Sequence, residues 1–432
     1  MQGLTRTARL PADAAGAAIL ARAADAFERR LDPDSRAPLA VGFSGGGDSL
    51  ALLLAAQAWA AGVRRPVLAL TVDHGINSLS AAWTAHAAEV AATLGVGFRA
   101  LNWSGEKPKT GLQAAARRAR HGLLAETARA AGASVLLLGH TLDDVAEAEW
   151  MRANGSSVGA PREWAPSPAW PEGRGVFLLR PLLGLRRAEL RERTLPAGLG
   201  WIEDPANEDE RFLRARARHA RPQAVAPSSD PADLAGDFEV NLAGVARLSR
   251  DAALRDRDLA MACVSAGGGE RLPRGDTVGR LLSRIGTGER FAATLAGARI
   301  DAGDDITICR DAGRLPLDPQ ALPVGRPAVW DGRFEIIAHE PGMAVRPLAG
   351  LASRIDKRSR SRLGAFPHAA RRALPVLVGP DGKVTCPILA QDAFGSARAL
   401  VEGRLAAACG RIAREPAPWT SSHGERDAGA LS

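Results

Sequence analysis

The 432-residue chain contains no tyrosine, only four cysteines and no long apolar run. The cysteines are far apart and form no CxxC pair, which argues against a zinc site, an iron–sulfur cluster or a disulfide-bonded secreted fold. No apolar stretch approaches the roughly 20 residues of a membrane span, and charged residues interrupt the N-terminal stretch, which therefore lacks a signal-peptide core. These absences predict a cytoplasmic protein with no membrane partner, and the length predicts two or three domains.

Lysine is also scarce, so the positive charge of the chain is almost entirely arginine. Lysine and arginine together number 56 against 48 aspartates and glutamates, and the only lysines are Lys107, Lys109, Lys357 and Lys383. Because the planar guanidinium group suits phosphate, an acidic polymer is one reasonable partner. A GC-rich coding bias is the other explanation, which the abundant alanine and the absent tyrosine also suggest. The charge alone does not choose between them.

Short apolar runs alternate with longer helical ones from residue 39 to about residue 194. After the first strand and a helix through 51–61, the predicted strands cover 67–72, 98–103, 135–138 and 176–179, and the predicted helices cover 78–94, 111–131, 142–152 and 186–194. This alternation predicts right-handed βαβ crossovers and an α/β fold with a parallel, doubly wound sheet. Ligands of such sheets bind beyond the carboxyl ends of the strands.

The predicted domains are a catalytic domain over 1–222, with its core from about residue 37, a linker and helical segment over 223–290, and a mixed α+β domain over 291–432. Proline and serine mark the linker at 222–231, and a helix is expected over 234–265. Strands at 298–300 and 305–309 and hairpins at 330–336 and 376–382 are expected in the C-terminal part. Residues 154–175 are expected to form a long loop, either a functional lid or a disordered insertion.

The most informative stretch is Ser44-Gly45-Gly46-Gly47-Asp48-Ser49, which follows an apolar strand and opens a helix. Unpaired backbone N–H groups at a helix N-terminus favour an anion, and glycines let the backbone close around phosphate oxygens. Ser44 and Ser49 can add hydroxyl donors. The stretch is neither a Walker loop nor a dinucleotide fingerprint, since Leu50 occupies the position of the last glycine. The alternative is an ordinary glycine-rich turn.

Polar residues also follow the second and fourth predicted strands. Asp73 and His74 are placed to face a nucleotide, although a turn aspartate and a satisfied histidine are the ordinary alternative. The fourth strand is followed by a polar group on the next helix: His140, Asp143, Asp144 and Glu147. Paired carboxylates beside a triphosphate are natural ligands of Mg²⁺. Thr141 and Asp144 also fit a capping box, which explains Asp144 but not the other three residues.

Two groups of arginines carry the remaining signal. Arg117 lies in a basic helical turn and would stabilise the charge of a pyrophosphate leaving group. The second group forms one stripe of a helix at i, i+3, i+7 and i+10: Arg211, Arg214, Arg218 and Arg221. Such a stripe suits a nucleic-acid backbone. A solvated helix face is the usual interpretation of a charge run, but few acidic partners follow Glu210.

Together these stretches resemble the tRNA(Ile)-lysidine synthases, which belong to the ATP pyrophosphatases with an SGGxDS pyrophosphate loop. The motifs occur in the order of that family: SGGGDS at 44–49, VDHGIN at 72–77, GHTLDDVAE at 139–147, RPLL at 180–183 and WIEDPAN at 201–207. The resemblance is strong over residues 39 to about 218 and fainter in the C-terminal half. It implies a sheet of the adenine nucleotide α-hydrolase-like type.

The resemblance implies that ATP adenylates the 2-carbonyl oxygen of the wobble cytidine in the CAU anticodon of tRNA(Ile). The ε-amine of L-lysine then displaces AMP, and the resulting lysidine converts methionine identity to isoleucine identity. The implied ATP site comprises residues 44–49, Asp73 and His74, and Mg²⁺ is implied at Asp48 and Asp144. The implied catalytic residues are Arg117, His140, Asp143 and Asp144; Arg180 and the arginine stripe are expected to bind tRNA.

Three positions depart from the family pattern. His121 replaces a usual tyrosine, Asn154 stands where an arginine is usual, and Ala215 replaces an asparagine. Two alternatives to the ligase are a tRNA thiolase, which uses the same adenylation chemistry, and a catalytically silent RNA-binding protein. The absence of cysteine before Cys263 argues against the thiolase, and the intact glycine loop and acidic pair argue against the silent protein. The sequence predicts no oligomeric state.

Overall fold

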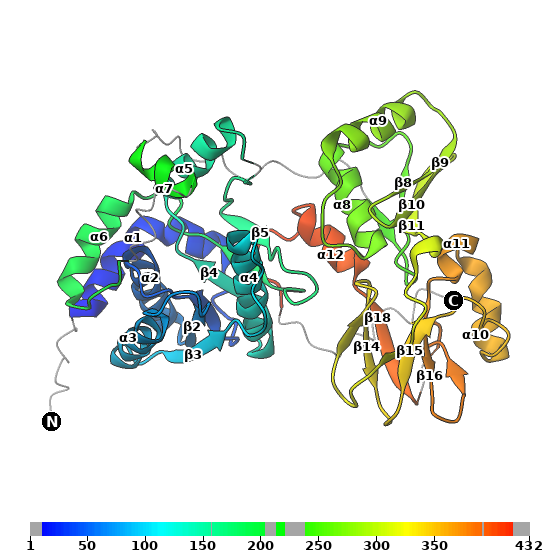
Figure 1. Ribbon diagram of the computed structural model, residues 1–432, viewed down its shortest axis with the longest axis horizontal. Coiled ribbons are helices and arrows are strands. Elements are labelled where there is room, and N and C mark those ends of the chain that lie inside the picture. Colours follow the sequence, from blue (N-terminus) through cyan, green and yellow to red (C-terminus); the bar gives the residue numbers. More distant parts are fainter. Residues whose placement is uncertain (1–10, 157, 204–212, 221–237, 391–392, 418–432) are drawn as a thin grey trace. The chain divides into compact units, whose positions relative to one another are not determined.

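The structure is a computed structural model that describes residues 11–156, 158–203, 213–220, 238–390 and 393–417. The chain divides into two compact units, shown in Figure 1. The first comprises Met1–Ala232 and Ile412–Thr420, and the second comprises Asp233–Arg411 and Ser421–Ser432. This division differs from the predicted one, because the predicted middle segment and the C-terminal domain share a sheet and belong to one unit. None of the described helices combines the length and the apolar character needed to cross a membrane.

The first unit is built on a six-stranded sheet in the order β3-β2-β1-β4-β6-β5. Its strands are β1 (Leu39–Gly42), β2 (Val67–Asp73), β3 (Gly97–Asn102), β4 (Val135–Leu138), β5 (Trp164–Pro166) and β6 (Phe177–Leu179). All neighbours pair in parallel except β5, which runs antiparallel to β6. The predicted parallel sheet is therefore confirmed, with one antiparallel edge strand added.

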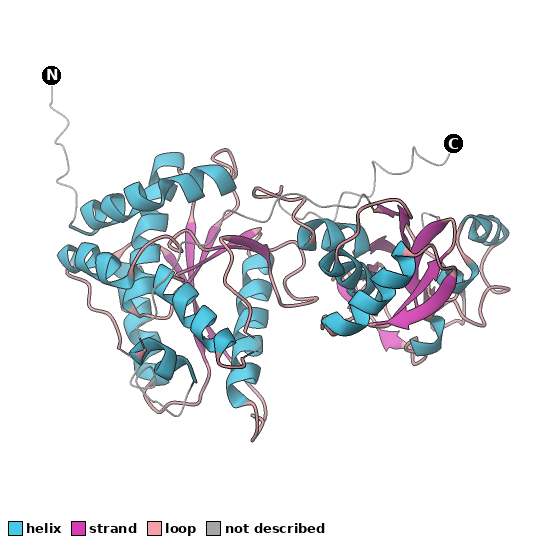
Figure 2. Cartoon of the chain, turned by 90° about the horizontal axis from the view of Figure 1, so that it is seen from above, coloured by secondary structure: helices cyan, strands magenta, loops and turns pink. Residues whose placement is uncertain are grey.

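Helices cover both faces of this sheet (Figure 2). They are α1 (Pro11–Arg30), α2 (Gly47–Val63), α3 (Ser80–Thr93), α4 (Leu112–Ala130), α5 (Leu142–Ala153), α6 (Arg187–Thr194) and α7 (Leu213–His219), and a 3-10 turn (Leu195–Ala197) extends α6. Every residue of β4 is buried, as expected for a parallel strand covered on both sides. The elements predicted between residues 67 and 194 end within about two residues of the observed limits, apart from β5.

The predicted structureless loop over 154–175 is wrong in part, because β5 lies within it. The Trp164 ring stacks on Phe177 of β6, with centroids 4.9 Å apart. An indole of this size supplies much buried apolar area in one contact. Burial of that ring favours the extended conformation of β5, and a strand of three residues is too short to show a period in the sequence.

The second unit contains three smaller antiparallel sheets. A five-stranded sheet comprises β7 (Glu239–Val240), β8 (Ala246–Ser249), β9 (Phe291–Leu295), β10 (Ala298–Ala302) and β11 (Asp305–Arg310). A four-stranded sheet comprises β12 (Gln320–Ala321), β15 (Ala344–Pro347), β16 (Pro375–Val378) and β17 (Val384–Thr385). A three-stranded sheet comprises β13 (Ala328–Trp330), β14 (Phe334–Ala338) and β18 (Gly395–Ala399). The predicted strands near 300 and 307 and both predicted hairpins are confirmed.

The helices of the second unit are α8 (Asp256–Gly267), α9 (Gly275–Gly286), α10 (Lys357–Arg362), α11 (His368–Arg371) and α12 (Val401–Ala408), with 3-10 turns at Ala312–Arg314 and Leu363–Ala365. The predicted helix over 234–265 is wrong in its first half, where β7 and β8 occur. Residues 246–249 alternate between buried and exposed side chains, which is the two-residue period of a strand.

Candidate active site

The glycine loop connects β1 to α2 at the carboxyl edge of the sheet. Gly45 has a φ of +80°, and a Cβ atom there would lie 2.6 Å from the side chain of Ile202. The backbone N–H of Ile202 donates to the carbonyl of Gly45 (2.9 Å). Ser49 Oγ donates to the carbonyl of Gly46 (2.8 Å) and accepts from the N–H of Ser44 (3.3 Å). Gly46 has no side chain to cap α2, so the first N–H groups of this helix are available to an anion.

Asp73 and His74 lie at the end of β2. Asp73 Oδ1 accepts from the N–H of Gly75 (2.7 Å), so the turn alternative holds for this residue. His74 packs its ring edge against Trp103, and its Nδ1 atom is buried without a hydrogen-bond partner among the described residues. Burial lowers the pKa of His74, and Arg120 lowers it further. His74 is thus not a satisfied core histidine, and its predicted contact with ATP stays a prediction.

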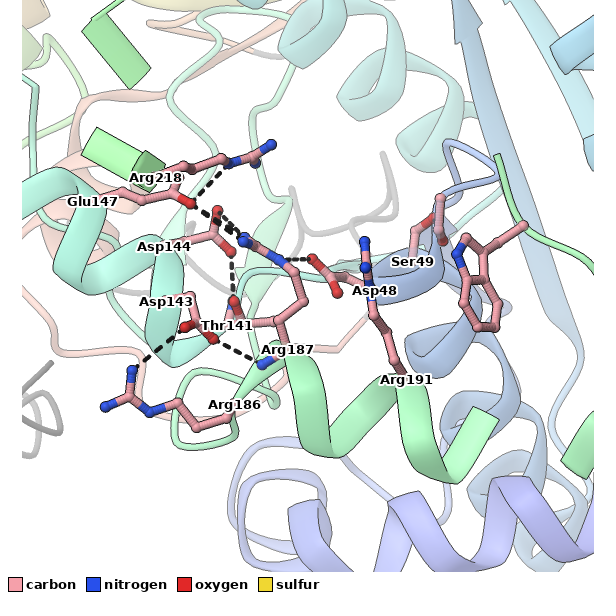
Figure 3. A network of polar contacts seen from close by, with 12 residues as sticks. Asp48, Ser49, Thr141, Asp143, Asp144, Glu147, Arg186, Arg187, Arg191 and Arg218 are labelled. Atoms are coloured by element: carbon pink, nitrogen blue, oxygen red, sulfur yellow. Dashed lines mark hydrogen bonds and ion pairs between the residues drawn. The ribbon is translucent and has the colours of Figure 1, made fainter. Parts of the chain in front are cut away.

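Asp144 and Glu147 form the buried acidic centre of the site (Figure 3). Asp144 Oδ2 accepts from the N–H (2.8 Å) and hydroxyl (2.9 Å) of Thr141, so the capping box is confirmed. The other oxygen of Asp144 contacts Arg214, which also donates to Glu147 (2.9 Å). Although burial raises the pKa of Asp144, Arg214 and then His140 outweigh it and bring the pKa to about 2. Asp144 therefore caps α5 and at the same time keeps its carboxylate ionised.

Arg187 joins this centre to the glycine loop. Its Nε donates to Asp48 Oδ2 (2.9 Å), and its terminal nitrogens lie 3.3 and 3.4 Å from Glu147 and 3.7 Å from Asp144. Burial lowers the pKa of Arg187, but Asp48 and Asp144 raise it above its ordinary value. Burial raises the pKa of Asp48, which Arg187 partly opposes. The sequence interpretation missed Arg187, since a helix start with two arginines gives no local signal of buried carboxylate partners.

Asp143 points away from the acidic centre toward the start of α6 (Figure 3). One carboxylate oxygen accepts from the backbone N–H of Arg187 (2.7 Å), and the other lies 3.4 Å from the Arg186 guanidinium. The N–H of Leu142 donates to the carbonyl of Leu185 (2.9 Å) and strengthens the same junction. Asp143 therefore positions α6 against α5, and its predicted place at the reaction centre stays a prediction.

His140 accepts a hydrogen bond at Nδ1 from Arg180 Nε (3.2 Å). Burial lowers the pKa of His140 to about 3, with Arg180 as the next cause. The ring is therefore neutral at physiological pH, and the accepting role of Nδ1 assigns its proton to Nε2. Arg180 is itself buried and donates to the carbonyl of Arg162 (2.8 Å). Its predicted role in tRNA binding stays a prediction.

Comparison with known proteins identifies the family. Residues 20–224 match the PP-loop domain. A tRNA(Ile)-lysidine synthase from Caulobacter vibrioides is 51% identical over 407 residues, covering 90% of this chain and 97% of that relative. The chain belongs to the tRNA(Ile)-lysidine synthase family.

Further members of the tRNA(Ile)-lysidine synthase family match most of the chain. The Hyphomonas neptunium enzyme is 36% identical and covers 71% of this chain and 90% of its own length. The Rhizobium meliloti enzyme is 33% identical, with coverages of 84% and 85%. A solved structure of a U34-tRNA thiolase from Methanococcus maripaludis is similar at 17% identity and a TM-score of 0.40, covering 47% of this chain and 71% of that one. The predicted family, fold class and ligase class are confirmed.

The family implies ATP, and Asp48 and Asp144 are the residues predicted to hold its Mg²⁺. No group of three or more acidic, histidine or cysteine side chains suited to a metal occurs in the described part of the chain. Mg²⁺ on a triphosphate needs only one or two carboxylates, because phosphates and water complete its coordination. The buried Oδ1 of Asp48 has no hydrogen-bond partner within the described residues, so a cation would satisfy it. The Asp48 carboxylate therefore fits a Mg²⁺ ion that arrives with ATP, and the predicted contact of Asp144 with that ion stays a prediction.

The basic residues of this lysidine synthase family member surround the acidic centre. Arg117 and Arg120 form no ion pair with any described residue, and burial lowers the pKa of Arg120 to about 10, with Arg117 and Arg214 as further causes. Arg120 follows Arg117 at i+3 on one helix face, a spacing that could have identified it. Arg218 donates to Glu147 (2.8 Å).

The side chains of Arg214 and Arg218 thus point into the site and contact its buried carboxylates, so these two arginines do not form a solvated helix face. Arg211 and Arg221 lie outside the described residues. A tRNA contact of the stripe stays a prediction.

Proposed function

We propose that this enzyme ligates L-lysine to the 2-carbonyl position of the wobble cytidine in the CAU anticodon of tRNA(Ile), through an adenylated intermediate. One observation carries the proposal: at the carboxyl edge of the sheet, Asp48 of the SGGGDS loop and Asp144 contact the same arginine, Arg187. The chain that holds this arrangement belongs to the tRNA(Ile)-lysidine synthase family. ATP, a Mg²⁺ ion, the tRNA and lysine are the ligands that this edge would bring together.

In the first step, the cytidine 2-carbonyl oxygen attacks the α-phosphorus of ATP, and the bond to the bridging oxygen breaks to release pyrophosphate. The N-terminus of α2 and the glycine-loop backbone would hold the leaving phosphates. Arg117 and Arg120, which have no carboxylate partner among the described residues, would stabilise the growing charge. Mg²⁺ at Asp48 and Asp144 would neutralise phosphate charge.

In the second step, the neutral ε-amine of lysine attacks carbon 2, and the carbon–oxygen bond to AMP breaks. Glu147 is a buried carboxylate whose partners among the described residues are guanidinium groups. A lysine ammonium carries the same charge and would suit this carboxylate before it loses its proton to solvent. His140 would donate from Nε2 to an oxygen of the adenylate, since a ring with its pKa near 3 cannot hold a proton as a base at pH 7.

The second unit would hold the body of the tRNA. Its helix α10 has the sequence KRSRSR, with four cations in six residues and no acid. Such a cluster matches the charge of a phosphate backbone.

The test combines the purified protein with ATP, Mg²⁺, labelled lysine and unmodified tRNA(Ile) bearing CAU. We expect stable lysine incorporation and AMP release with this tRNA, and neither with a methionine tRNA that has the same anticodon. Release of AMP without lysine incorporation would contradict the proposed nucleophile and retain only the adenylation step.

A further inference from the structure

The side chain of Arg187 contacts three carboxylates of the site, those of Asp48, Asp144 and Glu147, and Arg187 belongs to none of the motifs and has no predicted role. From the start of α6, Arg187 contacts Asp48, which lies in α2, and both Asp144 and Glu147, which lie in α5 (Figure 3). In sequence, Arg187 is 139 residues from Asp48 and 40 residues from Glu147.

The three carboxylates do not depend equally on Arg187. Asp144 and Glu147 also contact Arg214, and Glu147 contacts Arg218 as well. Asp48 has Arg187 as its one ion-pair partner among the described residues. Loss of the Arg187 side chain would therefore leave Asp48 without an ion pair among the described residues, with the charge of Arg191 still acting on it, while the other two carboxylates keep ion-pair partners.

The two oxygens of Asp48 have different surroundings. Oδ2 accepts from Arg187 Nε (2.9 Å), whereas Oδ1 is buried and has no partner within the described residues. A hydrogen bond to one oxygen fixes the rotation of a carboxylate and directs the other oxygen. Outer partners of this kind orient metal ligands, and their loss typically weakens metal binding about 10–100-fold.

The position of Arg187 is itself fixed by the backbone. Its N–H donates to Asp143 (2.7 Å), and the Leu142–Leu185 hydrogen bond joins α5 to the start of α6. Asp143 thus holds the helix start from which Arg187 reaches Asp48. Residues 142 and 143 of the GHTLDDVAE motif therefore hold the start of α6 in place, in addition to the carboxylate that Asp144 supplies to the site.

We infer that Arg187 is a positioning residue that binds one oxygen of Asp48 and presents the other to the Mg²⁺ of bound Mg·ATP. The inference rests on the Mg²⁺ assignment of the proposed function. It assigns Arg187 to the metal through Asp48, and not to a direct contact with ATP or lysine.

The test measures ATP binding by calorimetry in buffered free Mg²⁺, without tRNA or lysine, for the full-length wild type and Arg187→Gln. We expect the half-saturating Mg²⁺ concentration to rise about 10–100-fold in the variant, while ATP affinity in EDTA stays within about twofold. Arg186→Gln is the matched control, because its guanidinium contacts Asp143 and not Asp48. We expect this control to resemble the wild type.

A double-mutant cycle protects the test against a folding defect. Arg187→Lys retains the charge and should raise the Mg²⁺ requirement less than Arg187→Gln. In an Asp48→Asn background, neither change should raise it further, because the carboxylate that Arg187 positions is gone. Additive effects would overturn the inference, as would weaker ATP binding in EDTA, which indicates a direct ATP contact. An unchanged Mg²⁺ requirement in an Arg187→Gln enzyme that still forms lysidine would overturn it and leave the proposed function standing.

Discussion

Arg65 and Glu415 form a buried, two-pronged ion pair across 350 residues of sequence, with N–O distances of 2.8 and 2.5 Å. Glu415 also accepts from the N–H of Asp32 (3.0 Å) and the hydroxyl of Ser134 (3.2 Å). Nearby, the Trp164 indole donates to the carbonyl of Ile412 (2.7 Å). The segment after the second unit is therefore part of the first unit, which corrects its predicted place in the C-terminal domain.

Replacing Glu415 by alanine should strongly destabilise the first unit. The Arg65 guanidinium would remain buried without its partner, and breaking such a pair from one side costs about 3–5 kcal/mol. Chemical denaturation, followed by tryptophan fluorescence, measures the change. Glu189→Ala, which removes the ion-pair partner of the exposed Arg22 and of Arg193, should cost about 1 kcal/mol or less. Equal effects of the two variants would contradict this account.

Gly45→Ala should disrupt the glycine loop. The positive φ of Gly45 is unfavourable for alanine, and the new methyl group would meet Ile202. We expect a loss of about 1–3 kcal/mol in stability and weaker ATP binding. Gly62→Ala is the control, because it lies in α2 with open space at its Cβ position, and alanine there should stabilise the helix by about 0.5–1 kcal/mol. Wild-type stability and ATP affinity in Gly45→Ala would refute the prediction.

Arg117→Ala should lower turnover by about two to three orders of magnitude and leave tRNA affinity nearly unchanged, as for the loss of one preorganised charge donor. Single-turnover AMP release and a tRNA binding assay separate the two effects. Arg118→Ala provides the neighbouring control: both side chains are exposed, but the solvated-face interpretation applies to Arg118, so its loss should leave turnover nearly unchanged. Loss of tRNA affinity with intact chemistry would reassign Arg117 to the nucleic acid.

His121→Phe should make stability less dependent on pH. His121 is buried, neither ring nitrogen has a hydrogen-bond partner within the described residues, and burial lowers its pKa to about 2. Because the unfolded histidine titrates near 6.5, only the unfolded state takes up this proton between about pH 6.5 and 2. The wild type should therefore lose up to about 1.4 kcal/mol per pH unit from this group as the pH falls through that window.

The measurement is the free energy of unfolding from pH 8 down to the lowest pH at which the protein stays folded. The slopes of the wild type and His121→Phe should agree above pH 7 and diverge below pH 6. Parallel curves over the whole range would show that His121 does not remain neutral in the folded protein.

The sequence by itself determined the parallel sheet, the order of its motifs and the family. Apolar periodicity is a local property, so five of the six strands and the helices between them followed from neighbouring residues. The glycine loop was identified for the same reason, because its anion site is built from consecutive backbone N–H groups.

Only the tertiary structure decided which charges meet. Arg187 and Asp48 are 139 residues apart in sequence. Arg214 and Arg218 of the arginine stripe contact buried carboxylates, where the usual interpretation of a charge run is a solvated helix face. The β5 edge strand and the Arg65–Glu415 pair likewise depend on contacts between distant segments. Period and spacing report which face a residue occupies, but the partner on that face is set by how the elements pack against one another.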